Sequence, residues 1–327
     1  MEIALISLLS LILAFNIGAN NASSSMSTVY GAKMLSKLGA VSLVFIFVFL
    51  GASLGGEKVV TTVGKNLLDI DFLNLKSNLI YLVLVVPIVS ILIANKSKIP
   101  IATTHVVVCT IFGIGLSLNS LNLGKASEII VWWLITPIAI WLLNYLIGKY
   151  VYFEIVDKLI SMDGRKTQKI SFSLKFLLIS SACFLALFAG ANNAANAAAP
   201  IVGLNVISAG DAALISGFFM ALGALIFGGG IIENIATKIT SLSIIRAISV
   251  NFTGGSFLAF ASFYGIPISM AEIITSGIIG FSCSTSGFKK TFKKKSVAQI
   301  ITFWILAPII CIVISYLITN VIIGEII

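Results

Sequence analysis

Charged residues are scarce in this chain, and their scarcity excludes a soluble protein. Only 10% of the 327 residues are Asp, Glu, Lys or Arg, whereas 58% are hydrophobic; a soluble domain carries roughly 25% charged residues. The mean hydropathy is +1.11, and apolar runs of about 20 residues, long enough to span a bilayer as a helix, recur along the chain. These runs lack the alternation of a membrane β-barrel. The sequence therefore predicts an all-α polytopic membrane protein in the cell membrane.

The residues that support most enzyme and metal chemistry are also missing. His105 is the only histidine, and the four cysteines have neither paired nor metal-ligand spacing, so we expect reduced packing residues and no metal site. There is no ATP-binding loop and no Ser-His-Asp arrangement, and we expect neither an enzyme nor a bound cofactor. The net charge of +9 more often marks cytoplasmic loops than nucleic-acid binding in a membrane protein. We expect the lipid bilayer, and no nucleic acid, as the surroundings of this protein.

The chain repeats itself after about 170 residues. "GANNASSSM" at Gly18 matches "GANNAANAA" at Gly190, "IPIATTHVVVCTIFG" matches "IPISMAEIITSGIIG", and "WWLITP" matches "FWILAP". The matches occur in the same order in both parts. We therefore divide the chain into a first repeat, 1–152, a polar linker, 153–175, and a second repeat, 176–327.

The positions of the basic residues predict that the repeats are inverted. If the linker is cytoplasmic, 17 of the 21 Lys and Arg residues fall on the cytoplasmic side, including those near the turn at 96–98, and both termini are extracytoplasmic. In this assignment 57–78 is an outer loop. Segments 118–128 and 287–296 occupy equivalent places, yet the first holds one Lys and the second five, which indicates opposite sides of the membrane. Inverted-topology repeats are typical of secondary transporters; the alternative is a parallel duplication with uneven charge.

The two Gly-Asn motifs are the first candidate site. A Gly-Ala step can break a transmembrane helix, and such a break survives only where it is buried or lines a cavity. A half-helix that begins there would direct backbone N–H groups at the opening, and Asn side chains add neutral donors and acceptors. Plain helix packing through small residues is the alternative. We expect a substrate site formed by Gly18, Ala19, Asn20, Asn21 and Ser24 together with Gly190, Ala191, Asn192, Asn193 and Asn196.

Two shorter apolar segments begin at a proline. Pro100 to Leu116 and Pro267 to Phe281 are too short to cross a bilayer comfortably, and Pro is favoured in the first turn of a helix. We expect re-entrant, hairpin-like or half-spanning helices whose Thr103, Thr104 and Ser269 hydroxyls bind the substrate. An ordinary kinked membrane helix is the alternative.

His105 and Glu272 occupy equivalent positions in these two segments. An ionisable side chain at membrane depth is a functional candidate, so either residue could carry a coupling proton. The alternatives are a carboxylate at the membrane interface for Glu272 and a hydrogen-bonded packing residue for His105.

At the repeated Gly-Asn motif, the sequence resembles the inorganic phosphate transporter family, whose hallmark is a duplicated "GANDVANA"-type motif. "IPIATTHV" is similar to that family's Pro-x-Ser/Thr-Thr-His segment, and the resemblance covers essentially the whole chain. It implies secondary transport of a tetrahedral oxyanion driven by cations, H⁺ or Na⁺, and a homodimer. The family includes phosphate carriers and some bacterial sulfate permeases.

This chain departs from the family motif at one position in each repeat. The Asp of "GAND" is replaced by Asn21 and Asn193. A carboxylate can accept the protons of phosphate but repels sulfate, which carries none, whereas Asn offers donors. The sequence therefore favours sulfate over phosphate and, because two carboxylates that could bind sodium are lost, proton coupling over sodium coupling.

Three interpretations from different classes remain open. The leading one is a symporter that works by alternating access; its variant is a sodium-coupled phosphate transporter of the same fold. The second is an anion channel of the same architecture. The third is a membrane receptor or scaffold that transports nothing.

Overall fold

The chain, for which we describe a computed structural model, is nearly all helical. The structure describes residues 2–20, 22–69, 77–97, 101–161, 164–238 and 243–324, and this part of the chain contains no β-strand. Asn21 and Pro100, both singled out from the sequence, lie outside the described residues. Seven helices or continuous helical runs in the described part are long and apolar enough to cross a membrane. The all-α, multi-pass architecture expected from composition is confirmed.

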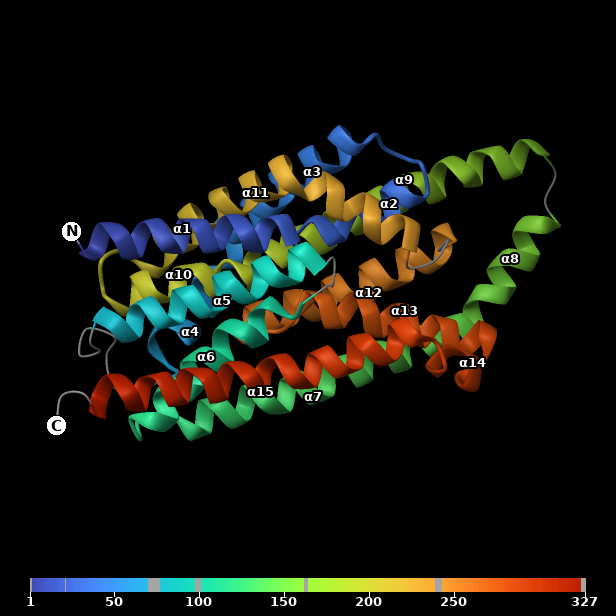
Figure 1. The fold of residues 1–327 in the computed structure, drawn as a ribbon. Coiled ribbons are helices and arrows are strands. Elements are labelled where there is room, and N and C mark those ends of the chain that lie inside the picture. The colour runs from blue at the N-terminus through green and yellow to red at the C-terminus, as the bar shows by residue number, and fades with distance from the viewer. Residues whose placement is uncertain are drawn as a thin grey trace.

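The helices follow the apolar runs closely (Figure 1). In order they are α1 (Glu2–Asn20), the 3-10 turn η1 (Ala22–Met26), α2 (Ser27–Gly31), α3 (Lys37–Gly55), α4 (Glu57–Lys65), α5 (Ser77–Ser97), α6 (Thr103–Ser117), α7 (Leu123–Leu146), the π-helical turn η3 (Ile147–Val151), α8 (Tyr152–Ile160), α9 (Gly164–Asn193), α10 (Ala195–Gly203), α11 (Ala209–Lys238), α12 (Ile244–Phe263), α13 (Met270–Ser286), α14 (Phe288–Phe292) and α15 (Lys295–Gly324).

The two proline-led segments form short helices. α6 has 15 residues and α13 has 17, which at 1.5 Å per residue gives about 22 and 26 Å, less than the roughly 30 Å hydrocarbon core. Pro267 lies before α13, not in its first turn: the helix begins at Met270, with Ser269 as its N-cap. Pro267 lies in the short non-helical stretch 266–269, and the capped helix begins three residues after it.

The described ends of the chain and the linker lie at opposite ends of the molecule. Figure 1 shows the beginning of α1 and the end of α15 at one end, and α8 with the beginning of α9 at the other. We call these the termini end and the linker end. Each repeat therefore runs from one end of the molecule to the other.

The two repeats are interlocked and do not form separate lobes. α3 of the first repeat packs against α9, and α11 of the second repeat packs against α1. In the same way α7 packs against α13, and α15 packs against α6. Each long helix of one repeat is thus buried against a broken or short helix of the other.

Close helix crossings repeat with the two halves exchanged. A Cβ at Gly18 of α1 would overlap the carbonyl oxygen of Met220 in α11, and a Cβ at Gly190 of α9 would overlap that of Val48 in α3. Both partners of the second crossing are shifted by 172 positions from those of the first. The converse contacts follow the same rule: Gly223 with the Phe15 carbonyl, and Gly51 with the Leu187 carbonyl. The sequence repeat is therefore also a repeat of packing, which places backbones in direct contact where only glycine fits.

One segment expected to be a loop is partly helical. The range 57–78 begins with α4, whose Val59, Val60 and Val63 are fully buried. α4 packs against α10 and α11. The apolar residues at spacings of three and four give this short helix one buried face, so it is part of the packed protein.

The four cysteines are all free and buried, as expected for packing residues.

Candidate functional site

Both Gly-Asn motifs lie where a long helix ends, but the glycines are not the break. α1 continues through Gly18 and Ala19 to Asn20, and α9 continues through Gly190 to Asn193. The interruption comes later, before η1 in one repeat and at Ala194 in the other, where the backbone stays near helical angles. Gly18 and Gly190 instead permit the close crossings described above. Their expected role as helix breakers that expose N–H groups is therefore wrong, because packing rather than chain reversal requires them.

Amide and hydroxyl groups of the second motif and α6 form a buried cluster. Asn196 Nδ2 donates to Thr104 Oγ1 at 3.1 Å and lies 3.4 Å from Asn193 Oδ1. The Thr104 hydroxyl has two acceptors at 3.3 Å, Asn193 Oδ1 and the carbonyl oxygen of Ile268. The Asn193, Asn196 and Thr104 side chains are at most 1% exposed. Residues from three segments far apart in sequence thus meet at one point.

Asn192 fixes the segment that leads into α13. Its Nδ2 donates to the Ile266 carbonyl at 2.9 Å and to Ser262 Oγ at 3.2 Å, and its Oδ1 accepts from the Ile268 N–H at 3.0 Å. Two of these hydrogen bonds hold the backbone on either side of Pro267, and the third binds the Ser262 side chain. Ser269, expected to bind substrate, accepts a 3.4 Å hydrogen bond from the Glu272 N–H and so caps α13.

His105 and Glu272 face each other where α6 and α13 begin. His105 Nδ1 lies 3.2 Å from Glu272 Oε1, within ion-pair distance, but neither ring nitrogen has hydrogen-bond geometry to a described partner. Both side chains are buried, at 6% and 7% exposure. The His105 ring stacks on Trp133 with centroids 3.9 Å apart, and Trp133 Nε1 donates to the Pro267 carbonyl at 2.7 Å. The beginnings of the two short helices are thus joined by side chains from both repeats.

The first motif lies beside the second. α1 packs against α10, and η1 packs against α9. Gly18, Ala19 and Asn20 are buried, and the Ser24 hydroxyl donates to the Asn20 carbonyl at 3.2 Å. Thr103, the first residue of α6, is fully buried. Apart from Asn21, every side chain expected at the site is therefore placed, although Gly190 and Ala191 face α3, where Gly55 approaches Ala191.

A cavity of about 700 Å³ reaches the second motif. Its lining includes Ala191 and Ser262, together with the charged residues Glu57 and Lys58. Lys58 Nζ donates to the Phe263 carbonyl at 3.1 Å and lies over that residue's ring at 4.2 Å. Because Ser262 is hydrogen-bonded to the site residue Asn192, the cavity adjoins the candidate site.

The site offers neutral donors and one unused acceptor. Asn196 Oδ1 is buried and has no hydrogen-bond partner among the described residues, which is costly unless a ligand satisfies it. The N-terminal turns of α6 and α13, where the helix dipole favours negative charge, meet beside it. Among the described side chains of the buried amide–hydroxyl cluster and of the adjoining His105–Glu272 pair, Glu272 is the only carboxylate. The arrangement can bind a small anion next to a group that can take up a proton.

Two residues that contact the candidate site, Trp133 and Ser262, are not among the site residues expected from the sequence. Trp133 could have been found, because a Trp inside the apolar run of a transporter needs a partner for its N–H. Ser262 gives no such indication, because it lies at the end of an ordinary apolar helix.

Comparison with known proteins agrees with this architecture. The phosphate transporter family matches the chain over residues 17–315. The chain is 33% identical to the sulfate permease CysP of Bacillus subtilis over 98% of its own length and 88% of the relative. It is 30% identical to a candidate phosphate permease of Methanocaldococcus jannaschii over 96% of each protein.

A solved structure described as the sodium-dependent phosphate transporter has the same fold. Its TM-score is 0.83 with 22% identity, and the match covers 100% of both chains. These relatives and this structural neighbour are permeases and transporters, not enzymes. The chain belongs to the phosphate transporter family, and it is a multi-pass membrane transport protein.

Proposed function

We propose that this protein is a secondary active symporter that imports sulfate together with protons. The observation that carries the proposal is the buried cluster of Asn193, Asn196 and Thr104 at the converging N-termini of α6 and α13, with the His105–Glu272 pair beside it. The cluster is made of uncharged amides and a hydroxyl. Such a site suits an anion that brings no protons of its own.

The coupling group is Glu272 together with His105. A carboxylate taken from water into a protein interior is expensive unless it is paired or protonated, and an ionisable residue inside the membrane is functional by default. At 3.2 Å the two groups influence each other's charge directly. Uptake of a proton by this pair would offset part of the charge of the incoming dianion.

The mechanism we infer is alternating access between two inverted repeats. α1 begins at the termini end, whereas its equivalent α9 begins at the linker end (Figure 1), and these opposite directions support this topology. Two equivalent segments also lie at opposite ends of the molecule. The α6–α7 turn is near the C-terminal part of α15, where Ser117 Oγ donates to Asn320 Oδ1 at 2.9 Å, whereas α14 lies at the linker end (Figure 1). We assign the linker end to the cytoplasm because most Lys and Arg residues lie there.

A sodium-coupled phosphate transporter is the second candidate, and one observation favours it. Asn193 Oδ1, Asn196 Oδ1, Thr104 Oγ1 and the Ile268 carbonyl oxygen converge in one cluster. Oxygen atoms are the ligands that hard cations prefer. The structural neighbour's description names sodium and phosphate. Against this, both motif carboxylates are absent here and the more similar relative from Bacillus subtilis is named a sulfate permease.

Radiolabelled uptake into proteoliposomes tests the proposal. Sulfate and phosphate are offered together, and proton and sodium gradients are imposed separately. We expect sulfate uptake against its gradient, driven by an inward proton gradient and unaffected by a hundredfold excess of phosphate. Phosphate uptake that requires sodium would establish the second candidate, and flux only down the electrochemical gradient would establish a channel.

Replacement of Asn193 by Leu separates transport from a scaffold role. The leucine removes the amide from the cluster, so a transporter should lose uptake. A scaffold needs no such amide, so its role, expression and stability would be unchanged. Leu178→Ile, at a buried position elsewhere in α9, is the matched control and should retain uptake.

A further inference from the structure

A second pocket lies at the linker end, away from the transport site. Its volume is about 450 Å³, and it is bounded by α7, α13, α14 and α15. Apart from Ser276 its lining is hydrophobic, and it includes Trp141, Ile279, Phe288, Phe292 and Trp304. A pocket of this size and character suits an apolar ligand.

The two repeats differ at one position that lines this pocket. In the first repeat, Trp133 of α7 packs against Phe112 of α6, with ring centroids 6.2 Å apart. The equivalent residues of the second repeat are Trp304 and Ile279, and both line the pocket. The second repeat thus has the smaller side chain, isoleucine, where the first has phenylalanine.

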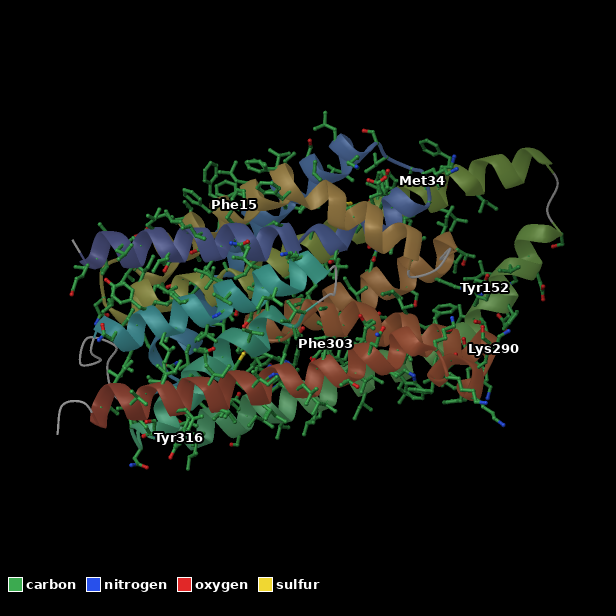
Figure 2. The ribbon with its side chains drawn as sticks, viewed as in Figure 1. Phe15, Met34, Tyr152, Lys290, Phe303 and Tyr316 are labelled. Carbon is green, nitrogen blue, oxygen red and sulfur yellow. The ribbon has the colours of Figure 1, made fainter. Side chains whose placement is uncertain are left out.

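Exposed lysines neighbour two of the residues that line this pocket. Phe288 and Phe292, which line it, belong to the same short helix as Lys289 and Lys290, and Lys293 and Lys294 follow directly. All four lysines are exposed, and no described carboxylate lies within ion-pair distance of them. Figure 2 shows Lys290 at the linker end, the same end as Tyr152 of α8. Four unneutralised positive charges thus stand beside an apolar pocket.

We propose that this pocket and the lysines of α14 bind an anionic phospholipid of the membrane. One acyl chain would occupy the pocket, and the phosphate headgroup would lie among Lys289, Lys290, Lys293 and Lys294. The depth fits: Trp304 lies nine residues into α15 after Lys295, about 13 Å along the helix, so the pocket runs from headgroup level into the hydrocarbon region. Basic clusters beside apolar helices on the cytoplasmic side are suited to anionic headgroups.

Two other occupants fit the site less well. Inorganic sulfate or phosphate would use the lysines but leave the hydrophobic pocket without a role. A second copy of the chain, docked about a twofold axis at this place, would bring two sets of four lysines together, and like charges at an interface cost binding energy. A lipid alone satisfies the charge and the apolar pocket together.

Lipid binding to the purified full-length protein in detergent tests the proposal. Phosphatidylglycerol and phosphatidylcholine with identical acyl chains are added, and bound lipid is counted by native mass spectrometry. We expect phosphatidylglycerol to bind at least tenfold more tightly. The K289Q/K290Q/K293Q/K294Q variant should lose that preference: one surface lysine contributes about fivefold, so the four together contribute on the order of a hundredfold or more. K58Q/K65Q/K125Q, with three lysines nearer the termini end, is the control and should retain it.

The pocket is tested by a variant that copies the first repeat. Ile279→Phe restores the larger side chain found at Phe112, and it should weaken binding of both lipids roughly tenfold while the protein still unfolds at a normal temperature. Any of three results would overturn the proposal. The first is equal binding of the two lipids by the unmodified protein, and the second is undiminished phosphatidylglycerol binding by the quadruple variant or by I279F. The third is displacement of phosphatidylglycerol by inorganic sulfate. A lysine variant that changed only the monomer–dimer equilibrium would overturn it in favour of a protein interface.

Discussion

His105 Nδ1 and Glu272 Oε1 lie 3.2 Å apart although they come from different repeats of the chain. They sit within the first turns of α6 and α13, and the 3.3 Å contact between Thr104 and the Ile268 carbonyl joins α6 to the segment that leads into α13. The pair is therefore placed at the boundary between the repeats that the proposed mechanism would move. A proton gained or lost by this pair changes the charge of the site at the contact between the two repeats, which would move relative to each other in the proposed mechanism.

Replacement of Glu272 by Gln should abolish proton-driven uptake while leaving substrate exchange. The amide keeps the size of the side chain but cannot accept the coupling proton, so an imposed pH gradient should no longer accelerate uptake. We expect a roughly ten- to hundredfold loss of gradient-driven sulfate accumulation, which corresponds to an ordinary coupling free energy. Uptake with and without a pH gradient measures it. Glu128→Gln, an exposed residue paired with Lys125 at 2.7 Å, is the matched control; unchanged proton dependence in the Glu272 variant would remove it as the carrier.

Replacement of Asn193 by Asp should shift selectivity from sulfate toward phosphate. The carboxylate repels an anion without protons, whereas it can accept a hydrogen bond from the hydroxyl of hydrogen phosphate. We expect the sulfate-to-phosphate uptake ratio to fall at least tenfold. Competition between labelled sulfate and phosphate measures the ratio. Asn205→Asp, in an exposed turn where the side-chain oxygen accepts from Lys65 at 2.8 Å, adds the same charge away from the site and should leave the ratio unchanged. An unaltered ratio in the Asn193 variant would mean that this position does not select the anion.

Replacement of Thr104 by Val should impair substrate binding more than folding. Valine keeps the shape but removes the hydroxyl that joins Asn193, Asn196 and the Ile268 carbonyl. Loss of a partner for buried polar groups costs about 1–3 kcal/mol, so we expect KM for uptake to rise roughly tenfold or more. Thr110→Val, in the same helix, removes a hydroxyl that donates to the Val106 carbonyl at 2.7 Å. Equal effects of the two variants on KM would contradict the special role of Thr104.

Replacement of Gly18 or Gly190 by Ala should destabilise the protein. A Cβ at either position would overlap a backbone carbonyl of the other repeat, and overpacking of a well-packed interior costs about 1–3 kcal/mol. Thermal unfolding in detergent should show a lower midpoint for both variants. Gly230→Ala, in an exposed part of α11 where a Cβ would meet nothing within 4 Å, should be neutral or stabilising by about 0.5–1 kcal/mol. A stable Gly18 variant would mean that the crossing with α11 can open without cost.

The sequence predicts the helices, the repeat and most of the site because these depend on local patterns. Apolar runs fix the long helices, prolines mark the short ones, and equal spacing relates His105 to Glu272. The predicted role of the glycines was wrong because a Gly-Asn motif is compatible with both a helix break and a close crossing. Only the position of Met220 or Val48 on another helix decides between them.

Partners brought in by the tertiary fold could not be predicted. Trp133 contacts the site because α7 packs across α13, which no local pattern indicates. Similarly, α4 falls in a segment with charged residues at both ends, and only its burial between the repeats makes it part of the packed structure. The hydrogen bonds of Asn192 to the segment around Pro267 depend on the same long-range arrangement.

The inverted topology predicts that two engineered cysteines react from opposite sides of the membrane. Ser127 in the first turns of α7 and Ser286 at the end of α13 are both exposed, and they lie near the two equivalent segments whose lysine content differs. The native cysteines are buried and free, so a membrane-impermeant maleimide should label S127C from outside and S286C only from the cytoplasmic side. Whole cells and inverted vesicles provide the two measurements, and the unmodified protein, which should remain unlabelled, is the control. Because parallel repeats would put equivalent segments on one side, labelling of both variants from the same side would exclude the inverted arrangement and, with it, the proposed alternating-access mechanism.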